Sequence, residues 1–299
     1  MIQEQQIILR TPAKVNLSLD ITGRRADGYH TLSSVFQAID CYDTLTIRRI
    51  ENDAPMTLCC QAEGVPCDSR NLVYRAAQRL LQAEEPRGIA MTLEKNIPSQ
   101  AGMGGGSSDC AAALLGIRAL LGLSVSDKAL SELAASLGAD VPFFLCGGTA
   151  LAEGIGEILT PITDVPERIL VVAKGREGVS TPEGYRKLDR LEEPLPMYTK
   201  AVLDALHTTQ PQRLFAACGN AFDAVTNLRE IRKIRLVMSS CGVKPVLSGS
   251  GAAVFGGCET MTQAAHLEQL LQGMDFVRIC KTIPYGVQQY GTDGIWHSL

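Results

Sequence analysis

The sequence lacks the residue patterns that mark several protein classes. Its 299 residues contain no Cys-x-x-Cys pair, and its four histidines do not lie near cysteines at metal-ligand spacing, so we expect no structural zinc site. No apolar run reaches the length of a membrane span, and the N-terminus lacks the basic and apolar regions of a signal peptide. We therefore expect a cytoplasmic protein whose ten scattered cysteines are mostly small buried hydrophobes.

A large excess of charge of one sign is also missing. The formal net charge of -4 argues against nucleic acid or an anionic membrane as a partner, although a local site can still be positive enough to bind a small anion. Hydrophobic residues make up 45% of the chain, which predicts a sizeable core. The length fits two domains or one large one.

Glycine is concentrated in one stretch near the middle of the chain. Four glycines occur within the five residues 102–106, followed by Ser107, Ser108 and an Ala/Leu-rich segment that reads as a helix. Glycine lets backbone amides turn inward and a ligand approach closely, and a helix beginning at Ser107 or Ser108 would present unpaired N–H groups. Together these features predict an anion site, most often one for phosphate. The serine hydroxyls would cap the helix or reach a phosphate or a metal ion; the alternative is a plain surface turn.

Two other phosphate loops do not match this stretch. No lysine follows the glycines, so the Walker pattern G-x-x-x-x-G-K-S/T is excluded. A G-x-G-x-x-G pattern could begin at Gly102, but its last position is Ser107 and the chain has no run of βαβ units.

The first strand carries polar residues at alternate positions. Residues 13–21 place four aliphatic side chains on one face, with Lys14 and Asn16 on the other face about 7 Å apart. That polar face is either solvated or part of a site. Residues 23–30 then form a polar turn ending in Tyr29 and His30, whose rings could stack on a flat ligand and hydrogen-bond to it, or tuck under the turn.

The rest of the first half reads as mixed strands and helices. We expect strands near residues 45–50, 56–61 and 89–94, a helix capped by Asn71 and a helix capped by Ser126. Residues 149–161 read as a hairpin or a glycine-bent pair of strands. Asp140 stands among apolar neighbours, so its carboxylate needs a partner such as a lysine, a metal or backbone amides, unless it only caps the turn before Pro142.

The second half reads as a ferredoxin-like unit after a linker at residues 161–166. Its expected order is strand 169–173, helix 228–240, strand 245–247, strand 252–255, helix 261–271 and strand 276–283, which is β-α-β-β-α-β. Residues 175–195 are polar and poorly periodic. A second glycine-rich turn at residues 248–253 predicts a tight hairpin that could also support the first loop.

Three stretches in this order and spacing resemble the three motifs of the GHMP small-molecule kinases. They are Pro12-Ala-Lys-Val-Asn-Leu, Pro98 with the following glycine loop through Asp109, and Leu247-Ser-Gly-Ser-Gly-Ala. The resemblance covers nearly the whole chain. It implies a two-domain α+β fold, with an N-terminal ribosomal-S5-like α/β domain at residues 1–163 and a C-terminal ferredoxin-like domain at residues 164–299.

Further stretches are similar to one branch of that superfamily. Residues 22–30, 137–144 and 148–157 look like signatures of the kinases that phosphorylate the 2-hydroxyl of a cytidine-diphosphate-linked methylerythritol in the non-mevalonate isoprenoid route. The resemblance therefore implies ATP as phosphoryl donor, Mg²⁺ carried with it, and that small molecule as acceptor. It implies a monomer or homodimer.

The resemblance assigns roles residue by residue. Asp140 would be the general base and Lys14 would keep it ionised and offset charge on the transferring group. Asn16 would contact the sugar alcohol, Tyr29 and Tyr185 would sandwich the cytosine, His30 would bond to the base edge and Thr181 would contact the diphosphate. ATP would be bound by Asn71, Lys95, Pro98, Ala101, Gly102, Met103, Gly104, Gly105, Gly106, Ser107 and Ser108.

Some features depart from the family pattern or leave alternatives. Gln100 and Ala101 stand where some relatives have glycines, and Met103 replaces a common leucine. No acidic residue is marked clearly as a magnesium ligand, so the metal is expected to be held mainly by ATP phosphates. The alternatives are another kinase of the superfamily, of the homoserine or mevalonate type, and a non-catalytic nucleotide sensor on the same fold.

Overall fold

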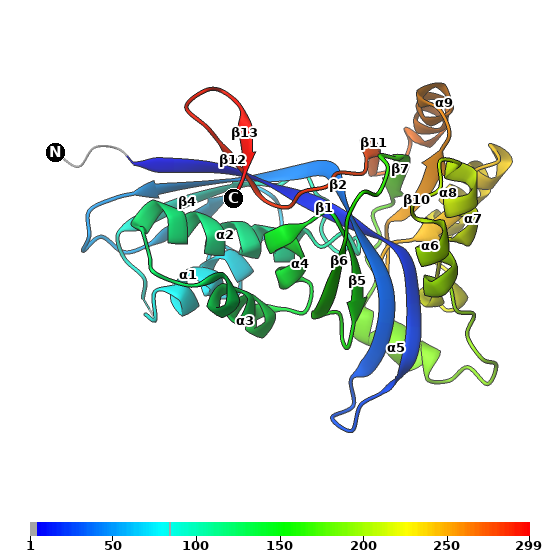
Figure 1. Cartoon of the computed structure of the whole chain (residues 1–299), viewed down its shortest axis with the longest axis horizontal. Helices are drawn as coiled ribbons and strands as arrows, with labels where there is room; N and C mark the ends of the chain where they lie inside the picture. Colours follow the sequence, from blue (N-terminus) through cyan, green and yellow to red (C-terminus); the bar gives the residue numbers. More distant parts are fainter. Residues whose placement is uncertain (1–4, 84) are drawn as a thin grey trace.

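Two long antiparallel strands run through the molecule and carry the other elements (Figure 1). The computed structural model describes residues 5–83 and 85–299. Strands β1 (Gln6–Arg24) and β2 (His30–Arg49) pair along nearly their whole length and meet in the polar turn that the sequence predicts. Helices α1 to α4 lie to one side of this ribbon, and a second sheet with its helices lies to the other side (Figure 1).

The first sheet is built mainly from the N-terminal half. Among the described residues it has nine strands, with β13-β12-β1-β2-β4-β3 as its main path, β5 and β6 attached at β2, and the short β8 attached at β1. Its other elements from that half are β3 (Thr57–Cys60), α1 (Leu72–Leu80), β4 (Ile89–Glu94), α2 (Gly105–Leu121), α3 (Asp127–Leu137), α4 (Val141–Cys146), β5 (Thr149–Glu153) and β6 (Ile158–Ile162).

The second sheet has the ferredoxin-like order that the sequence predicts. Its strands lie in the order β11-β7-β10-β9, and all three pairings are antiparallel. The elements of this half are β7 (Ile169–Lys174), α5 (Thr181–Leu188), α6 (Thr199–Ala205), α7 (Pro211–Ala217), β8 (Gly219–Asn220), the 3-10 helix η1 (Ala221–Ala224), α8 (Arg229–Ser240), β9 (Pro245–Leu247), β10 (Val254–Cys258), α9 (Met261–Leu271) and β11 (Phe276–Lys281).

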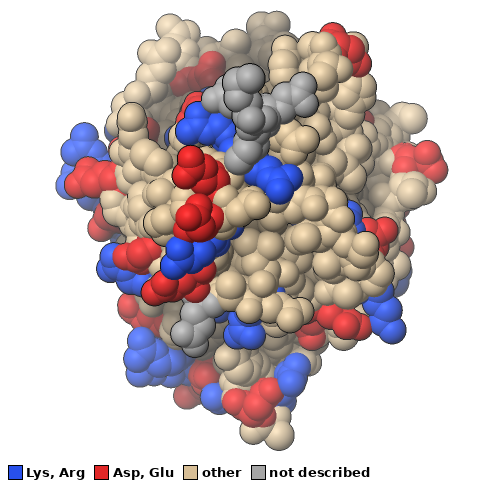
Figure 2. Space-filling view, turned by 90° about the vertical axis from the view of Figure 1, so that its left-hand side faces the viewer, with Lys and Arg blue, Asp and Glu red and all other residues tan. Residues whose placement is uncertain are grey.

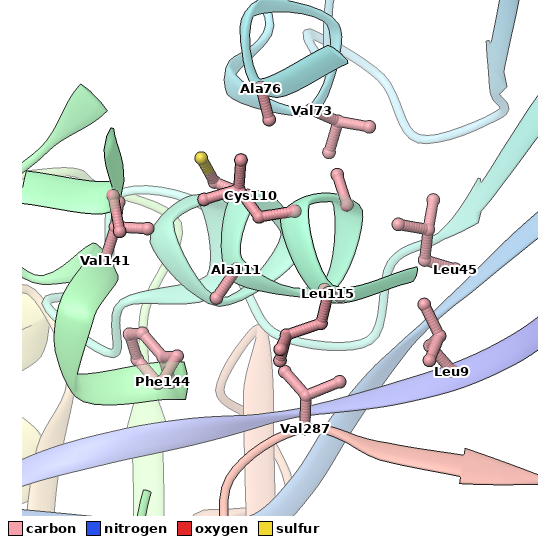
Figure 3. Packing of buried hydrophobic residues seen from close by; sticks show 14 of the residues in the cluster. Leu9, Leu45, Val73, Ala76, Cys110, Ala111, Leu115, Val141, Phe144 and Val287 are labelled. Atoms are coloured by element: carbon pink, nitrogen blue, oxygen red, sulfur yellow. The ribbon is translucent and has the colours of Figure 1, made fainter. Parts of the chain in front are cut away.

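Helix α2 is the centre of the first core. Its residues from Ser108 to Ile117 are all buried, because α1 and α4 pack against it on two sides and the first sheet on a third (Figure 3). Gly116 allows the sheet to come close, since a Cβ there would lie 2.4 Å from Cδ1 of Leu9. A helix that is apolar on all sides is stable only inside such a core. The core therefore holds the glycine loop at the start of α2 in place.

Three local expectations need correction. The segment from Thr181 to Leu188 is helix α5 and not an irregular loop. Helix α2 begins at Gly105, two residues before the first serine. The polar face of β1 is not solvated: Lys14 and Asn16 are 3% and 1% exposed. The turn at residues 248–253 and the start of α4 help to cover this face, through Gly249 on Asn16 and Asp140 beside Lys14. A pattern within one strand does not reveal this cover.

The end of the chain returns to the first sheet. Strand β12 (Gln288–Tyr290) pairs with β1, and β13 (Trp296–Ser298) pairs with β12 at the sheet edge. The domain boundary between residues 163 and 164 stays a prediction, and these last strands lie on the far side of it in sequence but on the first sheet in space.

Charges are mixed over the face at which β1 begins. Figure 2 shows Lys and Arg interspersed with Asp and Glu on this end of the molecule, in line with the small net charge of -4. Among residues 5–83 and 85–299, no helix has both the length and the apolar character needed to cross a membrane.

Candidate active site

Two cavities meet at the glycine loop. The hairpin cavity, of about 600 Å³, is bordered by the β1–β2 hairpin, the start of α5 and the turn at residues 248–253. The loop cavity, of about 450 Å³, lies between the start of α1, the end of β4 and the glycine loop. Gly102 and Gly104 line both cavities, so the loop forms the boundary between them.

The glycines are required by the shape of this loop. Gly102 and Gly104 have φ of +71° and +73°, a region that residues with a side chain rarely adopt. A Cβ at Gly102 would lie 2.0 Å from the Ser248 carbonyl oxygen, and one at Gly104 would lie 2.5 Å from Cζ of Phe144. The backbone of Lys14 also donates a hydrogen bond to the Met103 carbonyl, at 3.0 Å. The loop is thus fastened between β1, α4 and the second glycine turn.

The start of α2 has the geometry of an anion site. Gly104 is its N-cap and supplies no side-chain hydrogen bond, so no capping side chain occupies the first N–H groups. Gly105, Gly106 and Ser107 line the loop cavity, beside Pro98, Ala101 and Met103. Backbone N–H groups and the positive helix end would therefore act on an anion in that cavity.

The two serines after the glycines have different surroundings. Ser107 lines the loop cavity, whereas Ser108 does not. The Ser108 hydroxyl is fully buried, donates to the Pro12 carbonyl oxygen at 2.6 Å and contacts the hydroxyl of Thr11. The hydroxyl of Ser108 therefore ties α2 to β1, and the predicted ATP contact rests on Ser107 and on the backbone.

The glycine turn at residues 248–253 supports the glycine loop, as the sequence suggests. It joins β9 to β10 as a hairpin, and its Ser248 hydroxyl donates to the Gly102 carbonyl oxygen at 2.9 Å. Ala252 and Ala253 donate backbone hydrogen bonds to the carbonyls of Gln100 and Ala101, at 3.2 and 3.1 Å. The two sheets thus contribute to one loop structure.

A buried lysine and a carboxylate face each other in the hairpin cavity. Lys14 Nζ lies 3.5 Å from Oδ2 of Asp140 and donates to Oδ1 of Asn16 at 2.7 Å. The Lys14 side chain is 4% exposed and the Asp140 side chain 34%, so the carboxylate is the partner open to a ligand. Asp140 sits at the start of α4 but makes no side-chain cap bond, so its carboxylate is not occupied by the turn before Pro142.

Asn16 is held by several partners. Its Oδ1 accepts from Lys14 and from the backbone N–H of Gly249, the latter at 2.9 Å, and its Nδ2 donates to the Ser34 hydroxyl at 2.9 Å. The side chain joins β1, β2 and the second glycine turn, and it lines the hairpin cavity. This network fixes the position of the Lys14 ammonium.

Rings gather at the far end of the hairpin cavity. His30 stacks on Tyr185 with ring centroids 4.6 Å apart and planes 11° apart, and its Nε2 lies 2.7 Å from Oδ1 of Asp189. Tyr29 is 62% exposed. Burial, with a smaller contribution from the charge of Asp140, raises the pKa of Tyr185 to about 12. Thr181 begins α5, and its hydroxyl lies 2.7 Å from that of Ser250.

The loop cavity ends at a buried cluster of charged side chains. The sequence predicts Lys95 as a site residue but does not indicate Asp43 or Asp109. Lys95 Nζ lies 2.6 Å from Oδ2 of Asp109 and also contacts a carboxylate oxygen of Asp43. Burial opposes the Lys95 charge, but the two carboxylates outweigh it and raise the pKa of Lys95. Asn71 caps α1 through the backbone N–H of Val73, as predicted, and also lines the cavity. An acidic residue within an Ala-rich helix was the signal that could have identified Asp109.

Comparison with known proteins supports the same family. A model of the GHMP kinase N-terminal domain matches residues 71–148. The chain is 38% identical over 258 residues to 4-diphosphocytidyl-2-C-methyl-D-erythritol kinase of Alkaliphilus metalliredigens, covering 84% of this chain and 88% of that protein.

Solved structures give the same result. A crystal structure of 4-(cytidine 5'-diphospho)-2C-methyl-D-erythritol kinase is 35% identical with a TM-score of 0.76, covering 92% of this chain and 98% of that one. Homoserine kinase of Cytophaga hutchinsonii, at 18% identity and a TM-score of 0.73 with coverage of 97% and 98%, shares the fold. The chain belongs to the 4-diphosphocytidyl-2-C-methyl-D-erythritol kinase family, within the GHMP kinases.

Proposed function

We propose that the chain transfers the γ-phosphoryl group of ATP to the 2-hydroxyl of 4-diphosphocytidyl-2-C-methyl-D-erythritol, giving the 2-phosphate and ADP. The loop cavity would hold ATP and the hairpin cavity would hold the acceptor. One observation carries this assignment: Gly102 and Gly104 line both cavities, so a phosphate at the loop would face an acceptor beside Asp140.

The loop cavity fits the triphosphate of ATP. Its wall includes the open N–H groups at the start of α2, which stabilise anions without a formal positive charge. Asn71 and Lys95 also line this cavity and would contact the nucleotide there. The ordered backbone of the loop would hold the γ-phosphoryl group in line with the acceptor, which is the main catalytic need in phosphoryl transfer.

Asp140 and Lys14 would act on the reacting groups. The exposed carboxylate of Asp140 accepts the proton of the 2-hydroxyl while the hydroxyl oxygen forms its bond to phosphorus and the bond to the ADP oxygen breaks. The ammonium of Lys14 pairs with the Asp140 carboxylate and would offset charge on the transferring group. Asn16 holds Lys14 and contacts the sugar alcohol.

The rings of the hairpin cavity would recognise the cytosine. The base would stack between Tyr29 and Tyr185, and His30 would hydrogen-bond to its edge. In the structure His30 covers one face of Tyr185, so binding of the base requires His30 to move off that ring. Thr181 would contact the diphosphate from the start of α5, close to the turn that supports the loop.

Mg²⁺ belongs to this proposal as the ion that neutralises ATP phosphate charge. We assign it no protein ligand, because the hydroxyl of Ser108 is taken up by β1 and ATP itself supplies the oxygen ligands that Mg²⁺ prefers. The proposal also includes a cytoplasmic location and a small molecule as the only acceptor.

Substrate preference and one substitution test the assignment. ADP release should occur with the cytidine-diphosphate substrate and not with homoserine or mevalonate, and Asp140→Asn should lower kcat by roughly 10²–10⁴ with ATP binding retained. Asp127→Asn, a change at a carboxylate that is 94% exposed, is the matched control and should leave turnover unchanged. Full turnover by Asp140→Asn would contradict the mechanism, and turnover of another alcohol would contradict the acceptor.

A further inference from the structure

Asp109 has one oxygen bonded and one oxygen without a partner. Its Oδ2 accepts a hydrogen bond from Lys95 at 2.6 Å, whereas Oδ1 has no hydrogen-bond partner among the described residues. The residue is 2% exposed, so bulk water does not satisfy that oxygen. A buried polar atom left in this state is costly, so its position favours a further hydrogen-bond partner.

The cavity beside Asp109 is the one that meets the glycine loop. Asp109 lines the loop cavity together with Gly105, Gly106 and Ser107. It lies four residues after Gly105, on the same side of α2. A Cβ on Gly105 would lie 3.2 Å from Lys95 Nζ, so the ammonium that holds Asp109 also lies against the loop backbone. A ligand at the loop would thus lie close to the carboxyl group.

The charges around Asp109 favour its neutral form. One ammonium, Lys95, faces two carboxylates, and Asp43 also accepts from the backbone N–H groups of Asn96 and Ile97, at 2.5 and 2.8 Å. These bonds occupy both oxygens of the Asp43 carboxylate, whereas Oδ1 of Asp109 has no such partner among the described residues. Burial raises the pKa of Asp109 to about 8, against the opposing charge of Lys95. With Oδ2 held by Lys95, a proton carried on Oδ1 would make that oxygen a donor.

We propose that Asp109 is a nucleotide-binding residue whose protonated Oδ1 donates a hydrogen bond to a phosphate oxygen of ATP. This rests on the proposed function in placing ATP in the loop cavity. A neutral acid at this position adds a donor without adding negative charge beside the phosphates. An ionised carboxylate would instead repel them and leave both oxygens as acceptors.

The proposal predicts how ATP affinity depends on pH. ATP would bind the protonated form, so KM for ATP stays level below pH about 8 and rises as Asp109 loses its proton above it. The charged groups that face Asp109 are Lys95 after β4 and Asp43 on β2. Burial raises the pKa of the neighbouring Cys110 to about 12, so that thiol does not account for a change near pH 8.

Two substitutions at this position separate a donor from a charge. Asp109→Asn keeps a donor and cannot ionise, so ATP should bind within ~3-fold of the unaltered chain at pH 7, with a level KM up to pH 9. Asp109→Ala loses the donor, and ATP should bind ~10-fold more weakly at all pH values. The control is Asp127→Asn, which changes an exposed carboxylate on α3 and should bind ATP as the unaltered chain does.

The measurements are calorimetric Kd values for ATP, AMP and inorganic tripolyphosphate from pH 6.5 to 9.5, with KM and kcat beside them. A phosphate contact predicts that the alanine variant weakens ATP and tripolyphosphate alike and AMP less. Three results would overturn the proposal. They are an equal loss of ATP affinity in Asp109→Asn and Asp109→Ala, a KM for ATP that still rises above pH 8 in Asp109→Asn, and a higher Mg²⁺ requirement in Asp109→Asn. These Kd values are measured without the acceptor. They can therefore fail independently of the ADP-release assay that tests Asp140.

Discussion

The contact between the two glycine turns can be tested at Gly102. A Cβ added there would lie 2.0 Å from the carbonyl oxygen of Ser248 and 2.8 Å from its carbon, and both are backbone atoms that cannot rotate away. For Gly102→Ala the two turns must separate by about 1.5 Å to reach ordinary contact. The separation would break the hydrogen bonds that Gln100, Ala101 and Gly102 accept from the second turn.

The expected cost follows from these contacts. A left-handed alanine costs about 1 kcal/mol, and three hydrogen bonds contribute about 1 kcal/mol each, so Gly102→Ala should lower the free energy of unfolding by about 3–4 kcal/mol. Gly122→Ala is the matched control, because Gly122 has a φ of +61° but no atom within 4 Å of the added Cβ. It should cost only about 1 kcal/mol.

Urea unfolding of the two variants measures this difference, and KM for ATP reports the position of the loop. Displacement of the loop by about 1 Å should lower kcat/KM for ATP by about 10²-fold in Gly102→Ala, with Gly122→Ala near the unaltered chain. If both variants lose the same free energy and retain the same kcat/KM, the close approach of the two turns does not hold the loop and the reasoning is refuted.

Two further predictions concern the hairpin cavity. Tyr29→Ala and His30→Ala should raise KM for the cytidine substrate by about 10-fold and leave KM for ATP within about 2-fold, since both rings line the hairpin cavity and neither lines the loop cavity. Equal changes for the two substrates in steady-state assays would contradict the cytosine site. Asn16→Ala should lower kcat by more than about 10-fold and the free energy of unfolding by about 2–3 kcal/mol, because it leaves the Gly249 N–H and Lys14 without their acceptor. Urea unfolding and turnover measure the two effects, and a variant that keeps both values would show that the network is not required.

Much of the fold could be predicted because its signals are local. The caps at Asn71 and Ser126, the hairpin expected at residues 149–161 and the ferredoxin-like order of the second sheet are all present. Alternation and capping depend on residues within a few positions of each other, so one chain segment contains the whole signal.

The site was predicted in part, and the remainder depends on partners distant in sequence. Lys14 and Asp140 are far apart in the sequence and lie together in the structure, although their roles stay predictions. The placement of the Ser108 hydroxyl against Pro12, and of His30 on Tyr185, follows no pattern in either segment. Such contacts form only when the elements pack, and their energies depend on distances that the sequence does not state.

The sequence by itself determined the residues that make the chemistry possible: a glycine loop before an apolar helix, and a lysine, an asparagine and an aspartate in family motifs. Only the tertiary structure decided which of their atoms are free. It buried the polar face of β1, directed Ser108 to β1 and left Oδ1 of Asp109 beside the loop without a hydrogen-bond partner among the described residues. The physical reason is that burial and hydrogen-bond satisfaction belong to the packed assembly of elements, whereas residue type and local backbone preference belong to the chain.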